Sequence, residues 1–84
     1  MMSIDEFAER IKSMTIDELE EELEILQENL EDIQIERRQI FGKTAAHLNA
    51  KKFEKYRRSF DREILLLEKK ISLVKGFLDA GERK

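Results

Sequence analysis

Cysteine, proline and tryptophan are absent from this 84-residue chain, and only three of its residues are glycine. The lack of cysteine excludes structural disulfides and thiolate metal sites, and it fits a reducing compartment. The scarcity of turn residues argues against a β-protein. No stretch approaches the ~18 uncharged apolar residues of a membrane span, and Asp5, Glu6 and Glu9 lie where a secretory signal peptide would be basic and then apolar. We therefore expect a cytoplasmic protein without a membrane segment.

What the chain does contain is charge and a helical period. Charged residues make up 42% and hydrophobic residues 40% of the sequence, and the apolar positions recur about every 3.5 residues, as in coiled coils and helix bundles. This pattern predicts an all-α fold that forms a single helical domain over residues 1–84. A chain of this length buries only ~60% of the surface that its unfolded form exposes. We therefore expect it to gain stability by dimerising into a helical bundle.

The first helix is expected to be short, over about residues 3–13. Ser3 and Glu6 have the spacing of a capping box, in which the hydroxyl and the carboxylate satisfy backbone N–H groups at the helix start. Apolar residues follow at spacings of three and four and so share one face. These residues are Ile4, Phe7, Ile11 and Met14.

A second, long helix is expected over about residues 15–41. Thr15 and Glu18 form another capping box, and Gly42 is expected to end the helix in the left-handed conformation. The helix carries an apolar heptad seam that only Arg37 interrupts. The seam consists of Ile16, Leu19, Leu23, Leu26, Leu30, Ile33 and Ile40.

A third helix is expected over about residues 45–80, starting at either Thr44 or Asn49 and ended by Gly81 and the basic tail that follows it. Its seam has one intruding arginine, Arg57. The apolar seam residues are Ala50, Phe53, Phe60, Ile64, Leu67, Ile71, Val74 and Leu78.

The short connection predicts that the two long helices fold back as an antiparallel, coiled-coil-like hairpin. The third helix is the longer of the two by roughly 12 Å at 1.5 Å per residue, so its last turns should extend beyond its partner. We expect the first helix to cover this overhang. Its residues Ile4, Phe7 and Ile11 would then pack on Leu73, Val74, Phe77 and Leu78.

Charge is distributed unevenly along the chain. Residues 1–36 hold 13 acids and 2 bases, whereas residues 37–62 hold 9 bases and 2 acids. Heptad positions place two sets of charges on outward faces, and we interpret both mainly as solvated faces that keep the protein soluble. The acidic set on the second helix is Asp17, Glu21, Glu24, Glu28 and Glu31, and the basic set on the third is Lys51, Lys55, Arg58, Arg62 and Lys69.

A functional alternative is that part of the basic set forms an anion-binding patch near the turn between the two helices. Lys51, Lys55, Arg58 and Arg62 recur on one helix face, as binding to nucleic-acid phosphates would require. The overall isoelectric point near 5.3 argues against nucleic acid as the main partner.

The two seam arginines need an explanation, because an unpaired buried guanidinium is costly. We expect Arg37 and Arg57 either to reach the edge of the seam or to pair with Glu36, Glu54 or Asp61 and so fix the register of the helices.

Several apolar residues lie outside the seams, and a two-helix hairpin cannot bury them all. They predict a protein interface, for which a homodimer with a four-helix core is the preferred interpretation and a groove for another protein's helix the alternative. The expected interface residues are Leu65, Leu66, Leu73, Phe77, Ile25 and Ile35.

Nothing in the sequence indicates catalysis. The single histidine, His47, has no cysteine or glycine-rich phosphate loop near it, and the carboxylates are spaced for solvent, so we expect no enzyme, no metal and no cofactor. The expected function is that of a non-enzymatic helical hairpin that acts through protein–protein interaction, by self-association and by binding a partner protein as adaptor or regulator. The alternative is a nucleic-acid-binding or regulatory hairpin that uses the basic patch.

Overall fold

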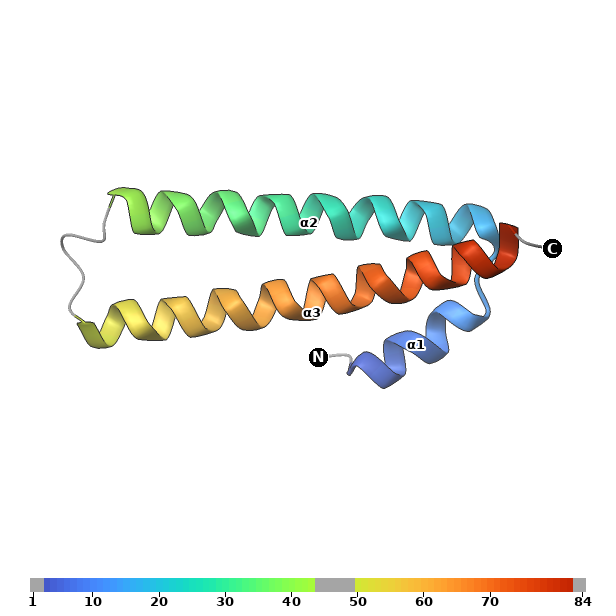
Figure 1. Cartoon of the computed structure of the whole chain (residues 1–84), viewed down its shortest axis with the longest axis horizontal. Coiled ribbons are helices and arrows are strands. Elements are labelled where there is room, and N and C mark those ends of the chain that lie inside the picture. The colour runs from blue at the N-terminus through green and yellow to red at the C-terminus, as the bar shows by residue number, and fades with distance from the viewer. Residues whose placement is uncertain (1–2, 44–49, 83–84) are drawn as a thin grey trace.

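The computed structural model describes residues 3–43 and 50–82, the side chains of residues 43, 50 and 82 excepted. This part of the chain consists of three helices, α1 (Ile4–Lys12), α2 (Ile16–Lys43) and α3 (Ala50–Glu82), and contains no strand. The helices α2 and α3 run antiparallel as a hairpin, and α1 lies beside the C-terminal half of α3 (Figure 1). The predicted all-helical hairpin is therefore confirmed. We call the end with α1 the base and the end where α2 leads to α3 the tip.

Both predicted hydroxyl caps are found at helix starts, and the reciprocal bond of a full capping box is found at Thr15 and Glu18. The Ser3 hydroxyl accepts a hydrogen bond from the backbone N–H of Glu6 at 3.2 Å. The Thr15 hydroxyl likewise accepts from the Glu18 N–H at 3.2 Å, and the Glu18 carboxylate accepts from the Thr15 N–H at 3.3 Å. These bonds satisfy N–H groups that have no partner within the first turn of a helix.

The left-handed conformation predicted for Gly42 is wrong, and both long helices extend one residue past the glycine near which they were expected to end. The helix α2 continues through Gly42 to Lys43, and α3 continues through Gly81 to Glu82. No described glycine has a positive φ. The physical reason is that glycine costs a helix only about 1 kcal/mol relative to alanine, too little to stop a turn that has other support. The two predicted starts of the third helix, Thr44 and Asn49, lie outside the described residues.

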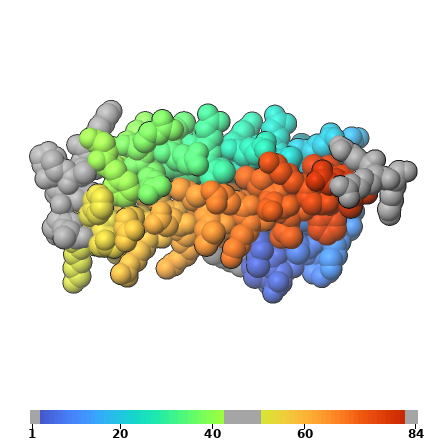
Figure 2. Space-filling view, in the orientation of Figure 1, coloured from blue at the N-terminus to red at the C-terminus, as the bar shows by residue number. Residues whose placement is uncertain are grey.

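The core is concentrated at the base, where all three helices meet. Phe7 and Ile11 on α1 are 1% exposed, and Val74 on α3 is fully buried. The expected covering of the end of α3 by α1 is thus confirmed, and the space-filling view shows α1 against this end of the hairpin (Figure 2). The buried cluster consists of Phe7, Ile11, Leu19, Leu26, Ile71, Val74 and Leu78.

The tip has only two helices and a thinner core. Among the described residues outside the base cluster, Phe60 is the one buried apolar side chain. Phe41 of α2 lies between two rings of α3, with its centroid 4.9 Å from that of Phe53 and 6.0 Å from that of Phe60. Aromatic packing therefore takes the place that aliphatic seam residues have at the base.

Candidate interaction surfaces

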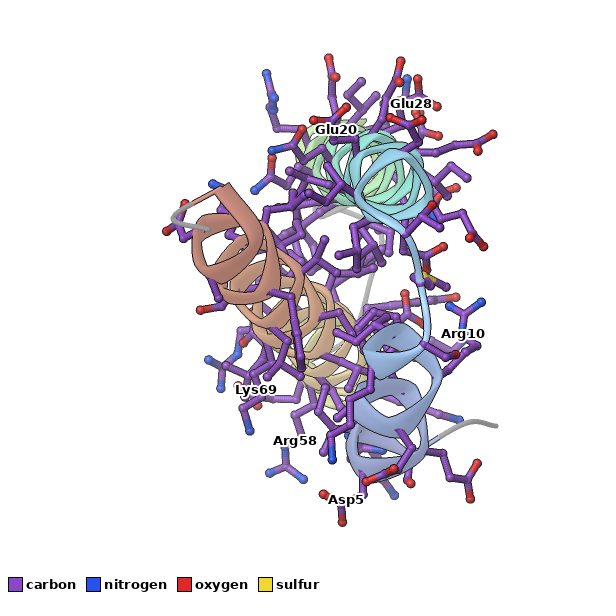
Figure 3. The ribbon with its side chains drawn as sticks, turned by 90° about the vertical axis from the view of Figure 1, so that its right-hand side faces the viewer. Asp5, Arg10, Glu20, Glu28, Arg58 and Lys69 are labelled. Carbon is purple, nitrogen blue, oxygen red and sulfur yellow. The ribbon has the colours of Figure 1, made fainter. Side chains whose placement is uncertain are left out.

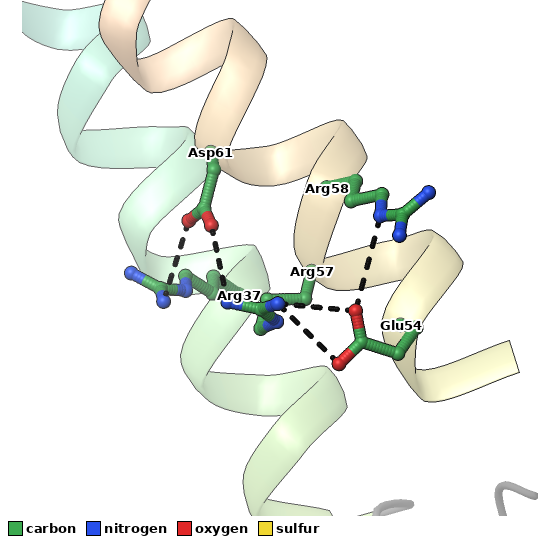
Figure 4. A network of polar contacts seen from close by, with 5 residues as sticks. All are labelled: Arg37, Glu54, Arg57, Arg58 and Asp61. Carbon is green, nitrogen blue, oxygen red and sulfur yellow. Dashed lines mark hydrogen bonds and ion pairs between the residues drawn. The ribbon is translucent and has the colours of Figure 1, made fainter. Parts of the chain in front are cut away.

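Both seam arginines form ion pairs near the tip, Arg37 across the two helices and Arg57 within α3. The Arg37 guanidinium lies 3.5 Å from the Asp61 carboxylate, and that of Arg57 lies 3.0 Å from Glu54 and 4.0 Å from Asp61. The hydrogen bond to Glu54 is the main cause that raises the pKa of Arg57 above its usual value. Figure 4 shows the network, which also includes a 3.9 Å contact between Arg58 and Glu54. The predicted pairing with Glu54 and Asp61 is confirmed.

A line of basic side chains runs along the solvent-facing side of α3. We call it the basic stripe and define it as Lys51, Lys55, Arg58, Arg62 and Lys69, all of which are exposed. Within the described residues Lys51, Lys55 and Arg62 make no ion pair. The shallow hollow along residues 51–62 is lined by α3 alone. Among the described residues, the predicted anion-binding patch is therefore an open strip lined by one helix.

A matching line of acids lies on the outer side of α2. We call it the acidic stripe and define it as Asp17, Glu21, Glu24, Glu28 and Glu31, all exposed. Figure 3 looks along the hairpin and shows Glu20 and Glu28 pointing away from the side on which Arg58 and Lys69 lie. The two stripes therefore face opposite directions, as the heptad positions predict.

The six predicted interface residues do not form one surface. Ile25, Ile35 and Leu65 are 47%, 40% and 53% exposed. Leu65 lies in line with the basic stripe and Ile35 in line with the acidic stripe, because helix neighbours three and four residues away share a face. Leu73 and Phe77 are instead half-buried against the base cluster, because α1 covers that side of α3.

The remaining predicted interface residue, Leu66, lines a shallow groove between α2 and α3. Ile33 and Leu67 lie in the same groove, with Asn29, Asp32 and Glu63 around it. Leu66 is one helical turn from Lys70, whose ammonium lies 5.3 Å from the centre of the Phe7 ring of α1. The groove is thus the continuation, toward the tip, of the space that α1 occupies. The heptad pattern does not locate this groove, although a helix of 9 residues is only about 14 Å long and cannot cover a whole hairpin.

The described residues contain no group of three or more His, Cys, Asp or Glu side chains close enough to hold a metal ion. None of the three described helices combines the length and the apolar character that crossing a bilayer demands. His47 lies outside the described residues.

Comparisons of the chain with protein-family models, with curated proteins and with solved structures find no match.

Proposed function

We propose that the protein is a non-enzymatic helical hairpin that acts through protein–protein interaction. It self-associates, with the homodimer as the smallest assembly, and it presents the same kind of surface to a partner protein as adaptor or regulator. The observation that carries the proposal is the exposure of Ile35 and Leu65 on the outer sides of α2 and α3. Fully burying such a side chain in an interface contributes about 1.5–3 kcal/mol of favourable free energy. This gain is large for a chain of this size, whose own core is small.

Sedimentation equilibrium tests self-association directly. At micromolar concentration we expect twice the chain mass of 10.0 kDa. Replacing Ile35 and Leu65 by serine should weaken association and leave the helical circular dichroism unchanged. Ile16→Ser is the matched control, because Ile16 is also 43% exposed but lies at the base against Gly81. A fully helical monomer at every concentration would contradict the proposal.

A second candidate is anion binding by the basic stripe. It is supported by the fact that Lys51, Lys55 and Arg62 make no ion pair within the described residues. A protein that neutralises several phosphates loses affinity steeply as salt rises from about 50 to about 200 mM. Titration of an oligonucleotide at these two salt concentrations tests it, and no binding at the lower one rules out nucleic acid.

A further inference from the structure

The acidic and basic stripes have the same spacing. Each recurs at intervals of 4, 3, 4, 3 and 4 residues once its exposed aliphatic residue is included, so each follows one line along its helix. In order, the positions on α2 are Asp17, Glu21, Glu24, Glu28, Glu31 and Ile35, and those on α3 are Lys51, Lys55, Arg58, Arg62, Leu65 and Lys69. The two stripes therefore match in spacing and are opposite in charge.

The stripes lie at opposite ends of the molecule. Ile16 of α2 lies beside Gly81 of α3, because a Cβ added to Gly81 would be 3.2 Å from the Ile16 side chain. Nearer the tip, Arg37 of α2 is paired with Asp61 of α3. A residue of α2 and a residue of α3 that lie side by side, at the same level along the hairpin, therefore have residue numbers whose sum is about 97–98. On this scale the acidic stripe occupies the base half of α2 and most of the basic stripe the tip half of α3, whereas Ile35 and Leu65 are both near the middle.

We propose that the partner of these stripes is a second copy of this chain, packed antiparallel, with its basic stripe on the acidic stripe of the first. The inference rests on the self-association proposed above and specifies its surface. When the ends of the two molecules are aligned, four of the five acids come level with the base that is 34 positions higher in the sequence, whereas Glu31 comes level with Leu65 and Ile35 with Lys69. The pairs are Asp17 with Lys51, Glu21 with Lys55, Glu24 with Arg58, and Glu28 with Arg62.

The antiparallel direction follows from charge. In a parallel arrangement with aligned ends, the tip half of α3 would face the tip half of α2, where Arg38 is exposed and would meet like charges of the basic stripe. In the antiparallel arrangement Ile35 and Leu65 both lie near the middle of the contact, about one helical turn apart along it. One side of the 54 × 20 × 17 Å molecule is also large enough for the ~800 Å² that each partner contributes to a standard interface.

This contact does not close on itself. The two stripes lie on opposite sides of the hairpin (Figure 3), so a pair of molecules still presents one acidic and one basic stripe to further copies. Such a head-to-tail contact builds open arrays instead of closed dimers. The mass should therefore pass beyond the dimer as concentration rises. It should fall as salt is added, because exposed charges are screened over about 8–10 Å near physiological ionic strength.

Charge exchange between two variants tests the inference. Lys55→Glu with Arg62→Glu makes both stripes acidic at the tested positions, and Glu21→Lys with Glu28→Lys makes both basic. We expect each variant alone to lose roughly tenfold or more in association constant, and their equimolar mixture to recover it. A chain that carries all four substitutions should also recover, because both stripes are then reversed together.

Lys12→Glu with Lys75→Glu is the matched control, since it gives the same net charge as the first variant at positions outside both stripes. Sedimentation gives the masses and circular dichroism verifies that all variants stay helical. The stripe pairing is overturned if the control loses association as strongly as the stripe variants. It is also overturned if neither salt nor stripe reversal weakens the association of the wild-type chain. Either result leaves the proposed self-association intact. A wild-type chain that is monomeric at all concentrations overturns both.

Discussion

The guanidinium of Arg10 on α1 lies 2.7 Å from the carboxylate of Glu22 on α2. The apolar face of α1 is directed mainly at α3, so this pair connects the short helix to the other arm of the hairpin. The side chain of Glu22 is 17% exposed and that of Arg10 is 44% exposed, which leaves the pair partly screened by water.

We expect a double-mutant cycle with Arg10→Ala and Glu22→Ala to give a coupling energy of about 0.5–1 kcal/mol, in the upper part of the range for exposed pairs. The cycle is needed because Arg10 also lies 5.4 Å from the centre of the Phe7 ring, and its single substitution removes that contact too. Urea unfolding of the four proteins gives the coupling. A coupling that is the same in 1 M salt would show that the pair is not ionic in character.

Leu26→Ala should lower the free energy of unfolding by about 2–5 kcal/mol, because Leu26 is 4% exposed in the base cluster. Leu65→Ala is the matched control, since Leu65 is 53% exposed and leaves no cavity in the monomer. Both should be measured at a concentration where the chain is monomeric. Equal losses from the two substitutions would mean that the outer side of α3 is part of the monomer's core.

Thr15→Ala should destabilise the protein by about 1 kcal/mol, because it removes the hydroxyl that accepts the Glu18 N–H at the start of α2. Thr15→Ser, which keeps an acceptor, should cost much less. Thermal unfolding followed by circular dichroism compares the two. If serine is as harmful as alanine, the methyl group of Thr15 matters and the cap does not.

Gly76→Ala should stabilise the protein by about 0.5–1 kcal/mol. Gly76 lies in the interior of α3, its φ is not positive, and a Cβ there would meet no atom within 4 Å. Alanine then only restricts the unfolded chain and favours the helix. Gly81→Ala is the comparison, and it should gain less because its Cβ would press on Ile16 at 3.2 Å. A loss of stability in Gly76→Ala would reveal a close neighbour at this position, such as a second copy.

The helices and their partners could be predicted because several signals agreed. Thr15 with Glu18 fixed one helix start, and the spacing of Ile4, Phe7 and Ile11 gave α1 a single apolar face that only the end of α3 could cover. Such agreement between local and tertiary signals is typical of sequences that specify one structure. The left-handed conformation predicted for Gly42 was wrong, because a residue preference of about 1 kcal/mol is weaker than the support of neighbouring turns.

The candidate surface was less accessible to sequence reasoning. Heptad positions identified both stripes as outward. The position of one helix along the other, however, depends on contacts such as that of Arg37 with Asp61, and the sequence left three possible partners for Arg37. Leu73 and Phe77 could equally belong to an interface or to the underside of α1. In the structure both side chains are half-buried against the base cluster.

The position of α1 also sets an order of events when the chain folds. Phe7 and Ile11 near the beginning of the chain pack with Val74 and Leu78 near its end, so the surface on which α1 docks exists only once α2 and α3 have closed. Contacts between residues so far apart in sequence carry a large loop-closure entropy until the intervening hairpin shortens the path. We therefore expect the hairpin to form first and α1 to join it last, as the final packing step of the monomer.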